Sequence, residues 1–252
     1  MYAPERHIAI LELARRAGRV DVATLAQDLA VTPETIRRDL TTLERRGTLH
    51  RVHGGAIPVE RLPEELRVSE RIHRNSPDKL NIAVATAELL PPSGTLFIDA
   101  GTTTALLASH LPEAEYTIVT HSLTIAQLLA DRPGITLVTI GGRIRERTLA
   151  AVGAVTLAQI HDLRVDYGIL GINGITPEFG LSTPDPEEAA VKDAIIGSAR
   201  HVLVMADHSK FGVEDLAHVA PLSDIDTIIT DRSVDPDRAA QVRTAGPEVV
   251  LA

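Results

Sequence analysis

Hydrophobic residues recur every three or four positions along the first part of the chain, and this spacing predicts three short helices. The first runs from Glu5 to Arg16 and ends at Gly18, and the second runs from Ala23 to Leu29. Thr32 is a good N-cap and Pro33 a good first residue for the third helix. The apolar side of that helix carries residues at i, i+4 and i+7, namely Ile36, Leu40 and Leu43.

A β-hairpin is predicted directly after the third helix. Short extended runs lie on either side of Gly54-Gly55, which is typical of two strands joined by a tight turn. Two helices joined by a short turn, here at about residues 20–39, indicate a helix-turn-helix, and an attached hairpin makes a wing. We therefore expect a winged helix-turn-helix domain over residues 1–57.

The polar side of the third helix suggests contact with DNA. Its short polar and arginine side chains are types that reach base edges and phosphates when a helix enters a major groove. Residues 1–57 hold 9 arginines and 7 acidic residues, whereas residues 58–252 hold 16 basic and 27 acidic residues, so only the first domain suits a polyanion. The alternative is a three-helix interaction module with a solvated arginine face. The expected contacts to double-stranded DNA are Thr32, Thr35, Arg37, Arg38, Thr41, Arg45, Arg51, His53 and Gly54.

Residues 58–78 are expected to form a linker. Pro58, Pro63 and Pro77 bracket a charged stretch, in which we expect one short helix around Glu64–Ile72. A passive spacer and a segment that transmits the state of one domain to the other are both compatible with this composition.

Strand and helix patterns alternate over the remaining residues, 79–252. Continuous apolar runs predict strands at Thr95–Asp99, Tyr116–Thr120, Ile135–Ile140, Asp166–Leu170, His201–Ala206 and Thr227–Thr230. Helical patterns flank and separate them at Lys79–Leu90, Thr103–Leu111, Leu123–Ala130, Val152–Ile160, Pro186–Ala199 and Asp235–Ala245. This alternation predicts an α/β domain with a mostly parallel sheet that is covered on both faces.

Polar residues and glycines follow the predicted strands, where ligands bind in sheets of this kind. Gly101 and three threonines form a turn into a helix, whose free N–H groups suit an anion. Together with carboxylates, an amide and a lysine, they suit a phosphorylated polyol. The expected effector-binding residues are Asp99, Gly101, Thr102, Thr103, Thr104, Thr120, Ser122, Gly141, Gly142, Arg143, Gly171, Asn173, Asp207 and Lys210.

Composition excludes several other classes. The chain has no cysteine, so a disulfide framework, a thiolate metal site and a cysteine nucleophile are excluded. It has no apolar run long enough to cross a membrane and no signal peptide, so we expect a soluble cytoplasmic protein without a membrane partner. Aromatic residues make up 2% of the chain, which disfavours a platform for single-stranded nucleic acid. Phosphate-loop and dinucleotide motifs are absent, and we expect neither a cofactor nor a metal.

The first domain resembles the winged helix-turn-helix of the DeoR/GlpR family of bacterial repressors. The resemblance is most specific at Thr35-Ile36-Arg37-Arg38-Asp39-Leu40 and at His53-Gly54-Gly55-Ala56, and it includes Arg6 and Gly47. Ala30 stands where the family commonly has Gly. We expect this turn to be strained, because positive φ is unfavourable for a residue with a Cβ.

The second domain resembles the sensor domain of the same family, which is similar in fold to ribose-phosphate isomerases; the resemblance covers residues 4–231. The matching residues include Lys79, Asp99 to Thr104, Gly141-Gly142, Gly171, Glu188, Lys192 and Asp207 with Ser209 to Gly212. His121 stands where Asn is usual and His208 where Ser is frequent. We expect both to be surface imidazoles, with a pH-sensitive ligand site as the alternative.

The resemblance implies a homodimer or homotetramer that represses a sugar operon until a sugar phosphate releases it, with fructose 1-phosphate as one candidate. The rival hypothesis is a sugar-phosphate isomerase with a DNA-binding domain. Isomerases of this fold bring acidic residues after the fourth strand, and Gly171-Ile172-Asn173-Gly174 offers none. We interpret the Glu188–Lys192 pair as a helical i, i+4 ion pair rather than a catalytic one, and we expect no catalytic residue.

Overall fold

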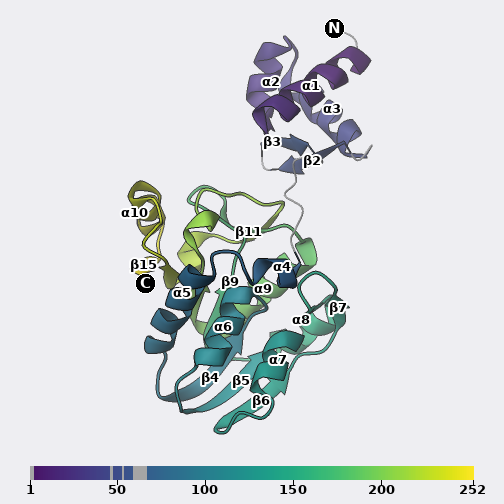
Figure 1. The fold of residues 1–252 in the computed structure, drawn as a ribbon. Helices are drawn as coiled ribbons and strands as arrows, with labels where there is room; N and C mark the ends of the chain where they lie inside the picture. The colour runs from purple at the N-terminus through teal and green to yellow at the C-terminus, as the bar shows by residue number, and fades with distance from the viewer. Residues whose placement is uncertain (1–2, 46–47, 53, 59–66) are drawn as a thin grey trace. The chain divides into compact units, whose positions relative to one another are not determined.

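The computed structural model describes residues 3–45, 48–52, 54–58 and 67–252, which fall into two compact units, residues 1–65 and 66–252 (Figure 1). Within those described ranges, no helix is both long enough and apolar enough to cross a membrane.

The first unit is a winged helix-turn-helix, as the sequence predicted. Its elements are α1 (Ala3–Ala17), β1 (Val20–Asp21), α2 (Val22–Asp28), α3 (Pro33–Arg45), β2 (Leu49–Val52) and β3 (Gly55–Pro58). The antiparallel pair β2–β3 forms the wing, and β1 pairs with the other edge of β3. The core is built from the predicted apolar side of α3 together with residues of α1 and α2, all at most 1% exposed: Ile10, Leu25, Ile36, Leu40 and Leu43.

Local sequence sets the start of α3 and the turn before it. The Thr32 hydroxyl accepts a hydrogen bond from the Thr35 N–H at 3.2 Å, which caps the helix, and Pro33 follows as its first residue. Ala30, between α2 and α3, has φ +52°, the left-handed conformation that the sequence comparison suggested. This conformation is unfavourable for alanine, because its Cβ approaches the following carbonyl oxygen.

Replacing Ala30 with glycine is expected to stabilise the first unit. Relief of left-handed strain is worth about 1–2 kcal/mol, and the larger entropy of glycine in the unfolded chain offsets about 0.4–1 kcal/mol of it. We expect a net gain of roughly 0.5–1 kcal/mol in the free energy of unfolding, measured by calorimetry. Gln27→Gly, at an exposed position inside α2, is the matched control and should destabilise the same unit. A loss of stability in Ala30→Gly would contradict the strain.

The second unit contains a seven-stranded parallel sheet, in the order β15-β14-β12-β9-β4-β5-β6. These strands are β4 (Ser93–Ile98), β5 (Glu115–Thr120), β6 (Ile135–Thr139), β9 (Val165–Gly171), β12 (Ala199–Met205), β14 (Thr227–Thr230) and β15 (Glu248–Leu251). The first six strands were predicted from the sequence, whereas β15, whose four residues pair with β14 alone, was not.

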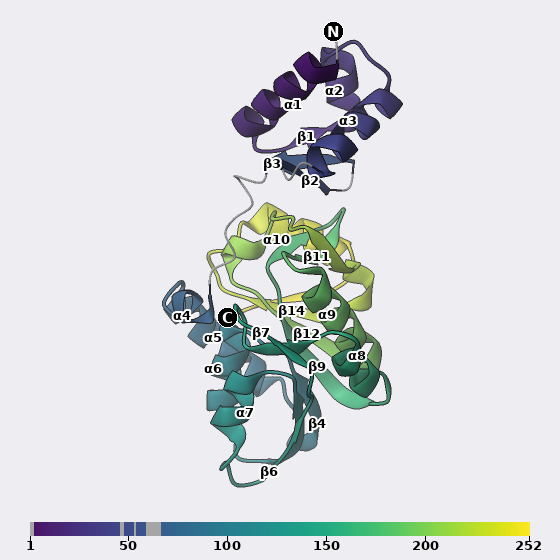
Figure 2. The ribbon, with the colours of Figure 1, turned by 90° about the vertical axis from the view of Figure 1, so that its right-hand side faces the viewer.

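Helices cover both faces of this sheet (Figure 2). One face packs against α5 (Ser76–Glu88), α6 (Thr102–His110) and α7 (Leu123–Leu129), through a core that includes Ile82, Leu107 and Ile125. The other packs against α8 (Ala154–His161), α9 (Pro186–Ser198) and α10 (Pro236–Thr244), through a core that includes Ile160, Ile195 and Val242. The expected doubly covered α/β architecture is therefore confirmed.

Short antiparallel pieces were not predicted. They are the hairpin of β7 (Arg143–Arg145) with β8 (Ala150–Val152), and a sheet of β10 (Gly174–Thr176), β11 (Gly180–Thr183) and β13 (Ala217–Ala220). Because β8 occupies residues 150–152, α8 starts at Ala154 rather than at the expected Val152. Strands of three or four residues are too short to show an alternating pattern.

The end of the expected linker belongs to the second unit. Its short helix is α4 (Val68–Arg71), and the Val68 N–H donates to the Arg147 carbonyl at 3.0 Å. The start of the helix expected around Glu64 lies outside the described residues. Residues 67–75 therefore lead directly into α5 as part of the α/β unit, and the last three residues of the expected linker, 76–78, begin α5 itself.

Candidate functional site

A buried ionic cluster fixes α3 on the rest of the first unit. The Asp39 carboxylate, 5% exposed, accepts from Arg6 Nε at 2.5 Å and Nη2 at 3.1 Å, and lies 3.0 Å from His7 Nε2. Burial opposes ionisation of Asp39, but hydrogen bonds from Arg6 and His7 hold its pKa below the ordinary value. The carboxylate thus ties α3 to α1 and sets the orientation of the helix that would read DNA.

The opposite side of α3 presents the predicted DNA-contacting residues to solvent. The side chains of Arg37 and Arg38 are 54% and 81% exposed and lie 3.3 and 3.8 Å from the Glu34 carboxylate. Exposed ion pairs of this kind are weak, so both arginines can exchange Glu34 for a nucleic acid. Thr32 is exposed and Thr35 half-buried at the start of the same helix.

The wing is joined to α3 through Arg51. Its Nη1 donates to the Thr41 hydroxyl at 3.3 Å, and its backbone N–H donates to Glu44 Oε1 at 3.1 Å. Gly54 in the hairpin turn is exposed, with φ +76°, and a Cβ there would meet nothing within 4 Å. Arg45 ends α3, and His53 lies outside the described residues.

The second unit buries a charged cluster at the carboxyl end of β4. Asp99 is 1% exposed, and its Oδ2 lies 2.5 Å from Lys192 Nζ and accepts from the Gly171 N–H at 3.0 Å. Lys192 also donates to the Gly171 carbonyl at 2.9 Å. Burial disfavours the ionised carboxyl, but Lys192 and His121 together hold the pKa of Asp99 below its usual value.

His121 belongs to this cluster, which corrects the expectation of a surface imidazole. It is 3% exposed, and its Nδ1 and Nε2 lie 2.8 Å from the Ala151 carbonyl and 2.9 Å from Asp99 Oδ1. The Ala100 N–H also lies 3.2 Å from His121 Nε2. His208 is half-buried, with Nδ1 2.9 Å from Asp231 Oδ2.

Lys192 does not pair with Glu188, which corrects the interpretation of a helical ion pair. Glu188 accepts from Arg145 Nη1 at 3.2 Å and from the Thr148 hydroxyl, and these contacts fix the β7–β8 hairpin on α9. Lys192, 4% exposed, turns to Asp99 instead. The four-residue spacing of Glu188 and Lys192 is compatible with an ion pair. It cannot reveal that Lys192 has a different partner, Asp99, which follows β4.

The turn from β4 into α6 has the geometry expected of an anion cradle. Gly101 is the N-cap, and Thr102, Thr103 and Thr104 form the first turn of α6, so their N–H groups lie at its positive end. The Thr104 hydroxyl donates to the Gly101 carbonyl at 3.1 Å and is buried. Asp99, two residues earlier, lies beside this turn.

Several other expected ligand residues are occupied by contacts that support the fold. Buried Thr120 donates to the Ile98 carbonyl at 2.7 Å, and buried Ser122 caps α7. The Gly141 carbonyl accepts from Thr156 and Gln159 of α8. Gly142 has φ +155°, and a Cβ there would collide with the Thr156 side chain. Arg143 pairs with Glu187, and the Asn173 side chain accepts from the Thr183 hydroxyl. The Gly171 N–H donates to Asp99, and the Gly171 carbonyl accepts from Lys192.

Asp207 and Lys210 lie in the loop after β12. Asp207 is 3% exposed, and its Oδ1 accepts from Asn75 Nδ2 at 3.0 Å and from the Ser209 N–H at 3.0 Å. Burial opposes ionisation of Asp207, but Ser209, Lys210 and Asn75 hold its pKa below the ordinary value. Asn75, the N-cap of α5, and Lys79, within α5, were absent from the predicted site.

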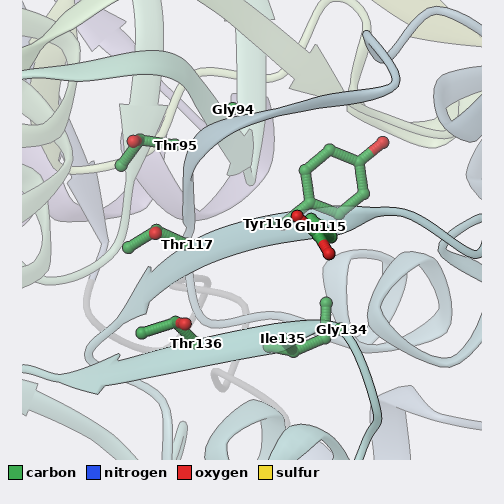
Figure 3. A pocket seen from close by; sticks show the side chains of 8 residues that line it. All are labelled: Gly94, Thr95, Glu115, Tyr116, Thr117, Gly134, Ile135 and Thr136. Carbon is green, nitrogen blue, oxygen red and sulfur yellow. The ribbon is translucent and has the colours of Figure 1, made fainter.

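Two other features of the second unit do not suit a phosphate ligand. A hollow of about 630 Å³ lies at the amino ends of β4, β5 and β6, where Glu115 is the one charged lining residue (Figure 3). Thr95, Thr117 and Thr136 stand in register beside it.

Among the described residues, one group of three side chains of metal-binding type lies close enough together to share an ion: Asp78, His208 and Asp231. Both oxygens of Asp231 already accept backbone N–H groups, so we assign no metal to it.

Comparison with known proteins covers both units. The family model of the DeoR-like helix-turn-helix domain matches residues 6–62, and that of the DeoR C terminal sensor domain matches residues 74–232. The chain belongs to the DeoR family of transcriptional regulators. It is 37% identical over 232 residues to the uncharacterized HTH-type transcriptional regulator FruR of Bacillus subtilis, with 92% of each chain covered.

Two further relatives of this DeoR-family chain cover almost its whole length. The glycerol-3-phosphate regulon repressor of Escherichia coli is 36% identical over 233 residues, with 92% of each chain covered. The regulator GlpR of Haloferax volcanii is 35% identical over 251 residues, covering 99% of this chain and 98% of its own. The chain is a DNA-binding transcriptional regulator, and the isomerase hypothesis is not supported, because these relatives are named regulators.

The solved structure of ribose 5-phosphate isomerase A from Methanocaldococcus jannaschii matches 54% of each chain, with 18% identity and a TM-score of 0.40. This likeness is too distant to bear on activity.

Proposed function

We propose that this DeoR-family regulator is a cytoplasmic repressor of an operon for sugar uptake or breakdown, and that a phosphorylated sugar releases it from its operator. The observation that carries the proposal is the turn from Gly101 to Thr104, which places the N-terminus of α6 beside buried Asp99. Helix N-termini bind phosphate groups, and carboxylates accept hydrogen bonds from hydroxyl groups.

The proposed ligand contacts lie at the carboxyl edge of the sheet. Thr102 and Thr103 donate backbone N–H groups to the phosphate, whereas Lys210 adds a positive charge and Asp207 accepts from a hydroxyl group. Thr120, Ser122 and Asn173 serve as supports for this edge, because their polar groups already bond to neighbouring elements. Fructose 1-phosphate is the first candidate, and glycerol 3-phosphate the second because one relative is named for the glycerol-3-phosphate regulon.

The proposed DNA contacts are Thr35, Arg37, Arg38, Thr41 and Arg45 on α3, Thr32 just before it, and Arg51 and Gly54 on the wing. His53, which lies outside the described residues, is proposed as a further contact. A homodimer or homotetramer presents two such units to a repeated operator. The sugar phosphate binds one state of the second unit more tightly, which lowers operator affinity by coupling of about 1–3 kcal/mol, or roughly 5–150-fold.

The test is fluorescence-anisotropy binding to DNA from upstream of the protein's own operon, at fixed salt concentration. Phosphorylated sugars are titrated beside their unphosphorylated parents. Release by one phosphate ester and not by its parent is the expected result. Tight specific binding that no sugar phosphate changes would contradict the proposed effector class but leave the DNA-binding role intact.

Replacing Lys210 with alanine is expected to spare operator binding and remove release by the sugar phosphate. The reason is that Lys210 lies in the loop beside Asp207, whereas the predicted DNA contacts all lie in the first unit. Arg200→Ala is the matched control, because it removes an exposed cation near the start of β12, the strand that leads to Lys210. This variant should release the operator normally when the sugar phosphate is added. Normal release in Lys210→Ala would exclude a phosphate contact for this side chain.

A further inference from the structure

The β7–β8 hairpin is bonded to three other parts of the second unit, and the first of these lies beside buried Asp99. The Ala151 N–H of β8 donates to the His121 carbonyl at 2.8 Å, and His121 Nδ1 lies 2.8 Å from the Ala151 carbonyl. The Leu123 N–H donates to the Leu149 carbonyl at 3.0 Å. These contacts fix β8 on the turn between β5 and α7.

The tip of the hairpin is bonded to α9 and to α4. Glu188 of α9 accepts from the Thr148 hydroxyl. The Arg147 carbonyl accepts from the N–H of Val68, the first residue of α4, at 3.0 Å. Because α4 is the first described element after residues 59–66, the hairpin holds the start of the second unit, which the chain enters from the DNA-binding unit.

His121 connects the hairpin to Asp99 through one ring atom that has two neighbours. Its Nε2 lies 2.9 Å from Asp99 Oδ1, which is an acceptor, and 3.2 Å from the nitrogen of Ala100, which is a donor. Nε2 donates only when it carries a proton and accepts only when it carries none. A change at Asp99, or at Ala100 just before the α6 cradle, therefore changes which bond His121 makes.

Helix α9 connects Asp99 to the tip of the same hairpin. Lys192 pairs with Asp99 Oδ2 at 2.5 Å, and Glu188, one turn earlier on α9, holds Thr148. These four side chains and His121 are all between 1% and 7% exposed. Closely packed interiors transmit strain, so a shift of the Asp99 carboxylate reaches the hairpin through both His121 and α9.

The turn of the hairpin is strained, which favours two arrangements over one. Leu149 has φ +55°, a conformation that is unfavourable for a residue with a Cβ. Hydrogen bonds at both of its peptide groups hold it there, because its N–H donates to the Arg145 carbonyl at 2.8 Å and its carbonyl accepts from Leu123. This strain opposes docking, so it lowers the free-energy difference between a docked and a released hairpin.

We propose that the β7–β8 hairpin couples the Asp99 cluster to α4, with His121 and Thr148 as positioning residues, and that docking and release of the hairpin set the operator affinity of the first unit. The segment before α5 is then a transmitting element and not a passive spacer. The part of this coupling in release by a sugar phosphate rests on the proposed function.

Val68→Pro removes the contact between the hairpin and α4 while preserving the helix. Proline lacks the N–H that donates to the Arg147 carbonyl, and it is well tolerated as the first residue of a helix. Arg67 has φ −60° and ψ 155°, which is the conformation that a residue before proline adopts. Val68→Ala keeps the N–H and is the matched control.

Operator affinity, measured by anisotropy at fixed salt concentration, tests the coupling without any ligand. Thr148→Val and His121→Gln should each change the operator Kd by about 5-fold or more in the original chain. In the Val68→Pro chain the same changes should have less than about a 2-fold effect. Thr136→Val and His110→Gln, at exposed positions of the second unit, should leave Kd unchanged. Equal effects with and without Val68→Pro, or no effect in the original chain, would overturn the proposal.

Amide exchange gives a second measurement that involves no DNA. Thr148→Val should speed exchange over residues 143–152 and at the Val68 N–H, because the hairpin is then less firmly docked. Exchange in α10 should keep its original rate, which also establishes that the variant is folded. Unchanged exchange at Val68 would overturn the link to α4. If His121→Gln does not fold, Thr148→Val alone completes both measurements.

Fructose 1-phosphate is the probe that relates the hairpin to the proposed effector. In the original chain it should lower operator affinity, and the operator should lower its affinity by the same factor. In Val68→Pro it should bind as tightly as in the original chain but no longer release the operator, and normal release would overturn the coupling. If it does not bind the original chain, this candidate effector fails, whereas the double variants still decide the role of the hairpin.

Discussion

Replacing Arg38 with alanine is expected to weaken operator binding by roughly 5–150-fold, because an arginine that reads a base edge contributes about 1–3 kcal/mol. Arg38 is the better candidate for that role than Arg37, since its side chain is 81% exposed and its nearest carboxylate oxygen, on Glu34, is 3.8 Å away. Specificity should relax at one operator position. The measurement is anisotropy with the operator and with single-base variants of it.

Two comparisons make this result specific. Arg37→Ala should weaken all sequences about equally and reduce the dependence of affinity on salt, as loss of a phosphate contact does. Arg200→Ala removes the same charge from the second unit and should leave operator binding unchanged. If Arg38→Ala binds the operator as tightly as Arg200→Ala does, α3 is not the reading helix.

Replacing Asp99 with asparagine is expected to lower the free energy of unfolding of the second unit by about 3–5 kcal/mol, because Lys192 is then a buried charge without its partner. Lys192 is 4% exposed, so water cannot replace the carboxylate. Calorimetry of the full chain measures this loss as a lower unfolding temperature of the second unit. The unfolding transition of the first unit should stay at its original temperature and serves as the internal control.

A double variant distinguishes an ion pair from simple packing. Asp99→Asn with Lys192→Met removes both charges and should be less destabilising than the two single changes added together. Additive losses would show that the two charges do not interact. Because the pKa of Asp99 is lowered in the fold, its contribution is fully present above the unfolded pKa and is lost as the pH falls through the folded value.

The helix-turn-helix was predictable because its signals are local. The Thr32-Pro33 start, the apolar i, i+4, i+7 side of α3 and the glycines of the wing each act over a few residues, and the structure confirms all three. The alternation of apolar strands and helices likewise predicted six strands of the large sheet, since a buried parallel strand is continuously hydrophobic.

The rest of the candidate site depends on contacts between distant residues. Lys192 has Glu188 four residues before it, and only the fold shows that its partner is Asp99. His121 is buried because the Ala151 carbonyl, from β8, lies opposite it, and β8 itself was too short to predict. Asn75 was placed in the linker and Lys79 at the start of a helix, and neither position in the sequence reveals that Asp207 lies nearby.

The position of β4 in the sheet has a consequence for the order in which the chain is made. β4 can pair with β5 as soon as β5 leaves the ribosome, but the other edge of β4 stays open until β9 has been synthesised. The Asp99 carboxylate gains its ion-pair partner later still, because Lys192 lies 93 residues further along the chain. A nascent chain that stalls before Lys192 therefore keeps an open strand edge and an unneutralised acid at the centre of the unfinished sheet, and quality-control proteases should distinguish it from the completed protein.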